Sequence, residues 1–403
     1  MNAIRPTSER IRSLDVLRGF ALLGILVMNI QSFSMIEIAY FNPTAYGDLE
    51  GANRVVWYLS SMLFDTKFMA IFSMLFGASA LLIVERTRSR GGRPFAVHAR
   101  RNLALLAIGF GHGQFLWHGD ILYHYALCAF IIYPFRNRSP RALFITGALI
   151  LAIGSSLWLM AGLTADEWPQ DSAEEHVADW QPGTEAVQEE LDVYRGSWSE
   201  QNSHRRSTAT EMQTFVFLFY FVWRVSGLML IGMGLYKLGV LSAQRSRRFY
   251  GILIAAGIVV GLPLAHLRVS ESVASGWDAF DAFFVYTQYN WWGSLAVALG
   301  WIGLVMLFCK SAAWLGRLGP LVAVGRMAFT NYLMQTVVCT TLFYGHGFGM
   351  FGRLERVEQI GVVLGVWVLQ LVGSPLWLRY FHYGPAEWLW RAATLLRWPA
   401  FRK

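Results

Sequence analysis

Residues 19–36 read GFALLGILVMNIQSFSMI, a run of eighteen residues without a charged side chain. A helix needs about 20 apolar residues to cross a bilayer core. Basic residues precede this run, as in a signal peptide, but no small-residue cleavage site follows Ile30. We therefore predict an uncleaved first membrane span.

The composition of the whole chain supports a membrane protein. Hydrophobic residues make up 55% and charged residues only 15% of its 403 residues, against about 25% charged residues in a globular protein. So few charges cannot cover a soluble surface of this size. The three cysteines, Cys128, Cys309 and Cys339, lie far apart in apolar runs. They fit neither a disulfide framework nor a zinc pattern, and we interpret them as small buried hydrophobic residues.

Nine further apolar stretches follow, so we predict an all-α polytopic membrane protein with ten transmembrane helices and an interfacial C-terminal helix. The third and fourth stretches are short and meet at His118–Asp120, which predicts a helical hairpin. The ten predicted spans are Gly19–Ile36, Lys67–Val84, Asn102–Trp117, Asp120–Phe135, Arg141–Thr164, Gln213–Val240, Phe249–Leu267, Asn290–Cys309, Leu321–Tyr344 and Val357–Tyr380.

The distribution of charge agrees with this division and predicts that both termini are cytoplasmic. With the N-terminus inside, 25 of the 34 basic residues fall in inside segments and 22 of the 26 acidic residues fall outside. Membrane proteins carry an excess of Lys and Arg in their short cytoplasmic loops. Nine or eleven spans would break this alternation.

An acidic segment separates two halves of five spans each. We predict an N-terminal half over residues 1–164, an extracytoplasmic loop over 165–211, a C-terminal half over 212–381 and an interfacial amphipathic helix over 382–403. The loop has twelve acidic residues against three arginines and should be partly helical. It is either a lid over an outward-facing cavity or a solvated linker. In the last helix, Pro385 and Glu387 suit the first turn, and its tryptophans suit a helix lying on the membrane.

The net charge of +8 does not indicate a nucleic-acid-binding protein, because the basic residues are dispersed over many juxtamembrane loops. We expect them to face membrane lipids or phosphorylated cytoplasmic ligands. Thirty arginines against four lysines suggest a GC-rich bacterial genome. We expect the bacterial cytoplasmic (inner) membrane as the location. A homodimer is compatible with these features, which do not set the oligomeric state.

Three polar clusters lie where a bilayer should exclude them, and such groups are candidate functional residues. In the first, Arg12, Asp15 and Arg18 share one helical face, and Asn29 lies about three turns deeper. These residues either anchor the helix among cytoplasmic headgroups or bind phosphate, which the arginine fork suits.

The second cluster surrounds the predicted hairpin, where three histidines and one carboxylate fall within thirteen residues. One interpretation is a helix capped by Asp120 with interfacial histidines. The other is a general base, His112 or His118, oriented by Asp120. The spacing of the histidines is not a usual metal pattern, so we predict no metal.

The third cluster follows Arg326, which should lie near the cytoplasmic headgroups. Interhelical hydrogen bonding explains one or two of its polar groups, but four suggest the wall of a polar channel. Arg224 in the sixth span could point into the same cavity. Snorkelling is sufficient to explain Lys67, and the role of Asp65 is left open. The four polar residues are Thr330, Asn331, Tyr332 and Gln335.

At these clusters the chain resembles the YeiB-like bacterial membrane family, whose C-terminal half is catalogued as domain of unknown function 418. The opening also resembles that of the heparan-alpha-glucosaminide N-acetyltransferases, which implies a transmembrane acyltransferase. In those enzymes a histidine lies in the loop after the first span, whereas residues 37–66 here contain none. The matching stretches are Arg12–Asn29, Phe72–Gly77, His112–Gly113, Gly119–Leu122, Gly325–Gln335 and Tyr383–Arg391.

The resemblance implies transfer of an acyl group from cytoplasmic acyl-CoA to an extracytoplasmic or membrane-embedded hydroxyl or amine. The acceptor would be a small molecule, a lipid or a glycan. His112 or His118 would be the base, with Asp120 orienting it. The alternatives are a transporter or lipid-handling protein without covalent chemistry, and a structural subunit. The residues expected to hold the acyl-CoA are Arg12, Asp15, Arg18, Asn29, Arg100, Arg101, Arg326 and Asn331.

Overall fold

The computed structural model describes residues 11–403, and every regular element in this range is helical, apart from one isolated bridge between Phe381 and Arg402. Seven helical segments among these residues are long and apolar enough to cross a membrane. The chain is thus an all-α protein with seven candidate membrane-spanning segments. They are Arg12–Ser34, Gly51–Ser89, Pro140–Leu163, Trp198–Lys237, Arg247–Ala274, Asp281–Lys310 and Arg356–Tyr380.

The other three predicted spans coincide with helices that are shorter, broken or less apolar. Helices α4 (Pro94–Phe115) and α5 (Leu122–Ile132) pack against each other as the predicted hairpin. The predicted ninth span is divided at Met327 into α15 (Gly319–Arg326) and α16 (Ala328–Phe343).

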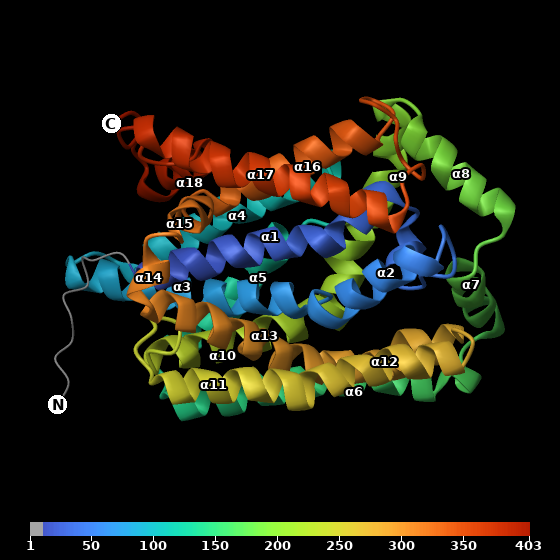
Figure 1. Ribbon diagram of the computed structural model, residues 1–403, viewed down its shortest axis with the longest axis horizontal. Coiled ribbons are helices and arrows are strands. Elements are labelled where there is room, and N and C mark those ends of the chain that lie inside the picture. Colours follow the sequence, from blue (N-terminus) through green and yellow to red (C-terminus); the bar gives the residue numbers. More distant parts are fainter. Residues whose placement is uncertain (1–10) are drawn as a thin grey trace.

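Helix α1 lies in the middle of the bundle and is mostly buried, whereas the spans at the periphery expose much of their surface (Figure 1). It packs against helices from both halves of the chain, and α10 packs against α3 and α6. Long apolar side chains on the exposed faces suit contact with lipid. The elements around α1 are α3 (Lys67–Ser89), α13 (Thr287–Lys310), α15, α16 and α17 (Arg356–Tyr380); α10 is Val222–Lys237 and α6 is Pro140–Leu163.

Glycines bring α1 and α15 into backbone contact. A Cβ atom built on Gly325 would lie 1.8 Å from the Asp15 carbonyl oxygen, and one built on Gly19 would lie 2.2 Å from the Leu321 carbonyl oxygen. Small residues allow such close approach between membrane helices. Gly19 and Gly325 therefore admit the neighbouring helix.

The acidic segment is folded and docked. Helices α7 (Gln170–Trp180), α8 (Thr184–Arg195) and α9 (Trp198–Glu211) lie at one end of the bundle (Figure 1). The predicted helical content is confirmed. The amide of Gly345 donates to the Tyr194 carbonyl at 2.8 Å, and the Tyr194 ring is buried. Beyond α9 the helix continues through the π-helix η4 (Met212–Phe221) into α10.

The last helix, α18 (Pro385–Leu395), lies at the opposite end of the bundle, where α1 begins (Figure 1). Glu387 does more than complement the dipole of its own helix. Its carboxylate accepts hydrogen bonds from the Phe329 amide at 2.7 Å and from the Thr330 hydroxyl at 2.5 Å. Those groups belong to the first turn of α16, so Glu387 caps a neighbouring helix.

Candidate functional site

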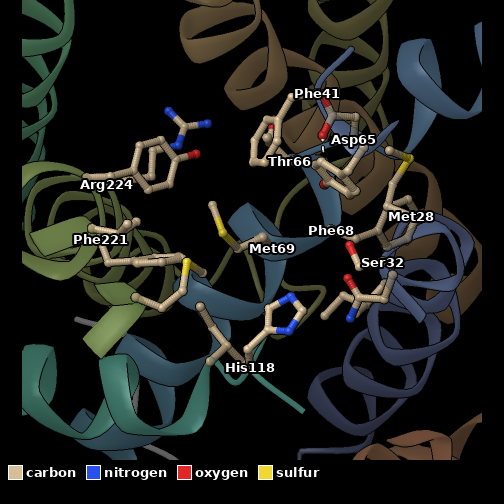
Figure 2. Close-up of a pocket in the computed structure, with 18 of the residues that line it drawn as sticks. Met28, Ser32, Phe41, Asp65, Thr66, Phe68, Met69, His118, Phe221 and Arg224 are labelled. Atoms are coloured by element: carbon tan, nitrogen blue, oxygen red, sulfur yellow. Dashed lines mark hydrogen bonds between the residues drawn. The ribbon is translucent and has the colours of Figure 1, made fainter. Parts of the chain in front are cut away.

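A cavity of about 410 Å³ lies between the helices, toward the end that carries α8. Its walls are largely aromatic and apolar, with a few polar side chains that come from distant parts of the chain (Figure 2). An apolar hollow with a small number of convergent polar groups is typical of a ligand-binding site. The polar or charged side chains that line it include Asn29, Ser32, Asp65, His118, Arg224 and Arg268.

His118 lies in the turn between α4 and α5, and its imidazole points into the cavity (Figure 2). Its Nδ1 is 3.5 Å from the hydroxyl of Tyr194, which comes from the acidic segment. Burial lowers the pKa of His118 to about 4. The ring is therefore uncharged at neutral pH and can accept a proton.

Asn29 and Ser32 line the same cavity from α1, and Figure 2 shows Ser32 on its wall. They are one helical turn apart and share a face of the helix. Both are half-buried, and no side-chain hydrogen bond of Asn29 is found among residues 11–403. Its amide is therefore available to a ligand.

Asp65 is the centre of a hydrogen-bond network on another wall. One carboxylate oxygen accepts from Arg268 Nη1 at 2.7 Å and from Asn290 Nδ2 at 2.9 Å. The other accepts from the Tyr40 hydroxyl at 3.1 Å. The sequence leaves the role of Asp65 open and gives no signal for Arg268, because an arginine near a helix end looks like an ordinary interfacial residue.

Lys67 does not snorkel toward water, so that interpretation is wrong. The side chain is completely buried, and its Nζ donates to the Ser61 carbonyl and to Asn290 Oδ1, both at 2.7 Å. Asn290 therefore connects Lys67 with Asp65. A tight turn with Thr66 at φ 59° places the two charged residues beside each other at the start of α3.

Arg224 lines the cavity from α10 together with Tyr332 of the third polar cluster, whereas Thr330, Asn331 and Gln335 lie outside the lining. Its Nη1 donates to the Trp291 carbonyl at 2.6 Å and its Nη2 to the Ser294 hydroxyl at 2.5 Å. The guanidinium also lies 4.8 Å from the centre of the Trp291 ring. A cation over an indole face is attracted by the ring quadrupole.

His112 and Asp120 are paired behind the cavity wall. His112 Nδ1 lies 2.8 Å from Asp120 Oδ1, and His112 Nε2 lies 3.0 Å from the Thr336 hydroxyl. The second Asp120 oxygen accepts from the Tyr123 amide at 2.8 Å, in the first turn of α5. Asp120 therefore both contacts a histidine and caps a helix. Neither His112 nor Asp120 lines the cavity.

The residues expected to hold acyl-CoA do not all lie at one site. Asn29 lines the cavity, whereas the others lie outside its lining. Arg18 donates to Asp15 Oδ1 at 3.0 Å and to the Ser79 hydroxyl at 3.3 Å. Arg101 lies between the rings of Phe76 and Trp390. Asn331 donates to the Ser374 hydroxyl at 2.9 Å, and Arg326 donates to the His382 carbonyl at 3.3 Å. The remaining residues outside the lining are Arg12 and Arg100.

Within the part of the chain that the structure describes, no three His, Cys, Asp or Glu side chains are close enough to hold a metal ion. The cavity lining offers an imidazole, two guanidinium groups and several amide, carboxylate and hydroxyl side chains.

Comparison with known proteins decides the family. The chain is 32% identical to the protein YeiB of Escherichia coli over 397 residues, which cover 96% of this chain and 97% of YeiB. The chain belongs to the YeiB family. YeiB-family membership is also supported by YxaH of Bacillus subtilis, which is 32% identical over 428 aligned positions that span 100% of this chain and 99% of YxaH.

The family profile described as "Protein of unknown function (DUF418)" matches residues 235–397. In this YeiB-family protein, that region supplies Arg268, Asn290 and Trp291 to the cavity, whereas Asn29 and His118 precede it. The cavity is thus built where the DUF418 region meets the N-terminal part of the chain.

Proposed function

We propose that this YeiB-family protein is an acyltransferase of the bacterial cytoplasmic membrane, with ten spans and both termini inside. It moves an acyl group from cytoplasmic acyl-CoA to a hydroxyl or amine acceptor. The observation that carries this proposal is that His118 and Asn29 line one cavity inside the bundle. A neutral imidazole can act as a general base, and a free amide can donate to a developing oxyanion, which are two roles used in acyl transfer.

The orientation follows from the charges at the two ends. The end with α18 and the start of α1 also carries the arginine-rich connection between α3 and α4. The other end carries the acidic helices α7 and α8. An excess of arginine marks the cytoplasmic side, so the cavity lies in the outer half of the membrane.

One face of α1 connects the cytoplasmic end of the bundle with the cavity. Arg18, Ile25, Asn29 and Ser32 recur at helical spacing, and all are half-buried among mostly buried neighbours. Arg18 and Asn29 are eleven residues apart, a rise of about 16 Å. The pantetheine arm of acyl-CoA would lie along this face, with its phosphates near Arg18 and its thioester near Asn29.

The reaction is a direct transfer. The acceptor oxygen or nitrogen attacks the thioester carbonyl carbon, a C–O or C–N bond forms, and the C–S bond breaks. His118 takes the acceptor proton and passes it to the departing thiolate, which leaves as CoA–SH. The Asn29 amide donates a hydrogen bond to the carbonyl oxygen as it gains negative charge.

The test uses inside-out membrane vesicles that contain the full-length protein and radiolabelled acetyl-CoA or palmitoyl-CoA. Wild-type vesicles should transfer label to a lipid or a luminal product, and His118→Gln should reduce the rate by at least about 100-fold. His266→Gln is the matched control, because His266 is an exposed histidine bonded to Tyr58 outside the cavity lining. Equal rates in wild type and His118→Gln would contradict the proposal.

A transporter or lipid-handling protein is the second candidate. It is favoured by one observation: the cavity lining does not include the predicted acyl-CoA arginines at the α18 end. The same vesicles separate the two functions. A transporter would move a labelled compound across the membrane unchanged, whereas an acyltransferase would convert it to a product with a new covalent bond.

A further inference from the structure

Arg224 is a buried cation that faces the cavity without a counter-ion. Its side chain is 1% exposed, and Figure 2 shows it on the cavity wall. Among residues 11–403, no carboxylate lies within 4.0 Å of its nitrogen atoms. Its partners are a carbonyl and a hydroxyl, and its Nε has none. An arginine keeps its charge in proteins.

The nearby carboxylate is already occupied. Asp65 accepts hydrogen bonds from Arg268, Asn290 and Tyr40. Arg268, which also lines the cavity, forms the ion pair with Asp65, and the buried Lys67 lies outside the lining. Glu37 and Glu211 also line the cavity, but neither is within ion-pair distance of Arg224 in the described part of the chain.

A buried arginine with a purely structural role does not need to face a cavity, as Arg356 shows. Arg356 is also 1% exposed, and it donates to the carbonyls of Pro43, Tyr46 and Asp48 outside the cavity lining. Arg356 therefore holds a loop in place. Arg224 has fewer acceptors and a ligand-sized space beside it. A buried charge without an anionic partner is costly, which favours a bound anion.

We propose that Arg224 binds an oxyanion, a carboxylate or a phosphate, in this cavity. We assign this oxyanion to the acceptor, whose hydroxyl or amine would face His118. This assignment rests on the proposed function. Trp117 and Trp291 line the same cavity, and their indole Nε1 atoms are buried and have no hydrogen-bond partner among residues 11–403. They are further donors for the oxyanion or for the rest of the acceptor.

The test measures the thermal unfolding of the full-length protein in an uncharged detergent at constant ionic strength. The probes are succinate, inorganic phosphate and dihexanoyl phosphatidate, and glycerol is the uncharged control. At saturation, an anionic probe should raise the wild-type Tm by about 4 °C. Arg224→Gln should remove this rise and weaken binding by at least about 30-fold. Arg224→Lys, which keeps the charge, should retain part of it.

Arg356→Gln is the matched control and should keep the full Tm rise. A response to succinate or phosphate indicates a soluble acceptor, and a response to the phosphatidate alone indicates a lipid. The inference is overturned if no anion raises the wild-type Tm, or if Arg224→Lys and Arg224→Gln, checked for folding by size-exclusion chromatography, respond like wild type. Because the assay reads binding alone, loss of the His118-dependent transfer and loss of the anion response are independent results.

Discussion

Nδ1 of His112 lies 2.8 Å from Oδ1 of Asp120, and the side chains of both residues are 1% exposed. Neither residue lines the cavity that contains His118. Tyr332 lies between His112 and the cavity, since it lines the cavity and its ring centre is 5.4 Å from that of His112. The histidine beside a carboxylate and the histidine beside the cavity are therefore two different residues.

Asp120→Asn should destabilise the hairpin. An asparagine oxygen can accept from His112 or from the Tyr123 amide but not from both, so one buried donor loses its acceptor. We expect a loss of about 2–4 kcal/mol in the free energy of unfolding, measured by titration with sodium dodecyl sulfate. Asp192→Asn, at an exposed position of α8, should change it by less than about 0.5 kcal/mol. Similar losses in the two variants would argue against a structural role for this pair.

Protonation of His118 should lower the stability of the folded protein at acidic pH. Burial lowers its pKa from 6.5 to about 4, so the folded protein favours the neutral ring. This contribution is complete above pH 6.5 and is lost as the pH falls toward 4. The Tm of the wild type should therefore fall more steeply over this window than that of His118→Gln. Parallel curves would show that His118 is not buried in its neutral form.

Glu190 should weaken the docking of α8 as the pH rises. Burial is the main reason that its pKa is raised from 4.5 to about 7, and the Glu37 amide, 2.8 Å away, opposes the shift. The docked state favours the protonated acid, so its stability is complete below pH 4.5 and is lost as the pH rises through 7.

Hydrogen exchange of Thr184–Arg195, corrected for intrinsic rates, should therefore be faster at pH 8 than at pH 5.5. Glu190→Gln should remove most of this difference. Glu189→Gln, the exposed neighbour, should leave it unchanged. If the difference in exchange rate between pH 8 and pH 5.5 persists in Glu190→Gln, another titratable group causes it.

Gly325→Ala should force α1 and α15 apart, because the new Cβ would lie 1.8 Å from the Asp15 carbonyl oxygen. Overpacking of this kind costs about 1–3 kcal/mol. Gly365→Ala, in a helix where nothing lies within 4 Å of the added atom, should be neutral or stabilising. The measurement is the Tm of both variants, and an unchanged Tm in Gly325→Ala would contradict the close approach.

The sequence alone was enough to predict the features that depend on neighbours along the chain. The apolar runs predicted helices, and the short His118–Asp120 connection predicted the hairpin. A carboxylate eight residues from His112 could contact it because the chain reverses direction between them. The composition of the acidic segment suggested a lid or a linker, but it did not show that Tyr194 reaches His118.

Only the tertiary structure decided which side chains share the cavity. Asp65 and Arg268 are separated by 203 positions, and no local pattern relates them. Lys67 resembled a residue that snorkels to the interface, yet α13 supplies Asn290 as its buried partner. The physical reason is that hydropathy sets whether a helix enters the membrane. The rotation and packing of that helix against its neighbours then determine which of its polar groups meet, and these depend on contacts between segments far apart in the sequence.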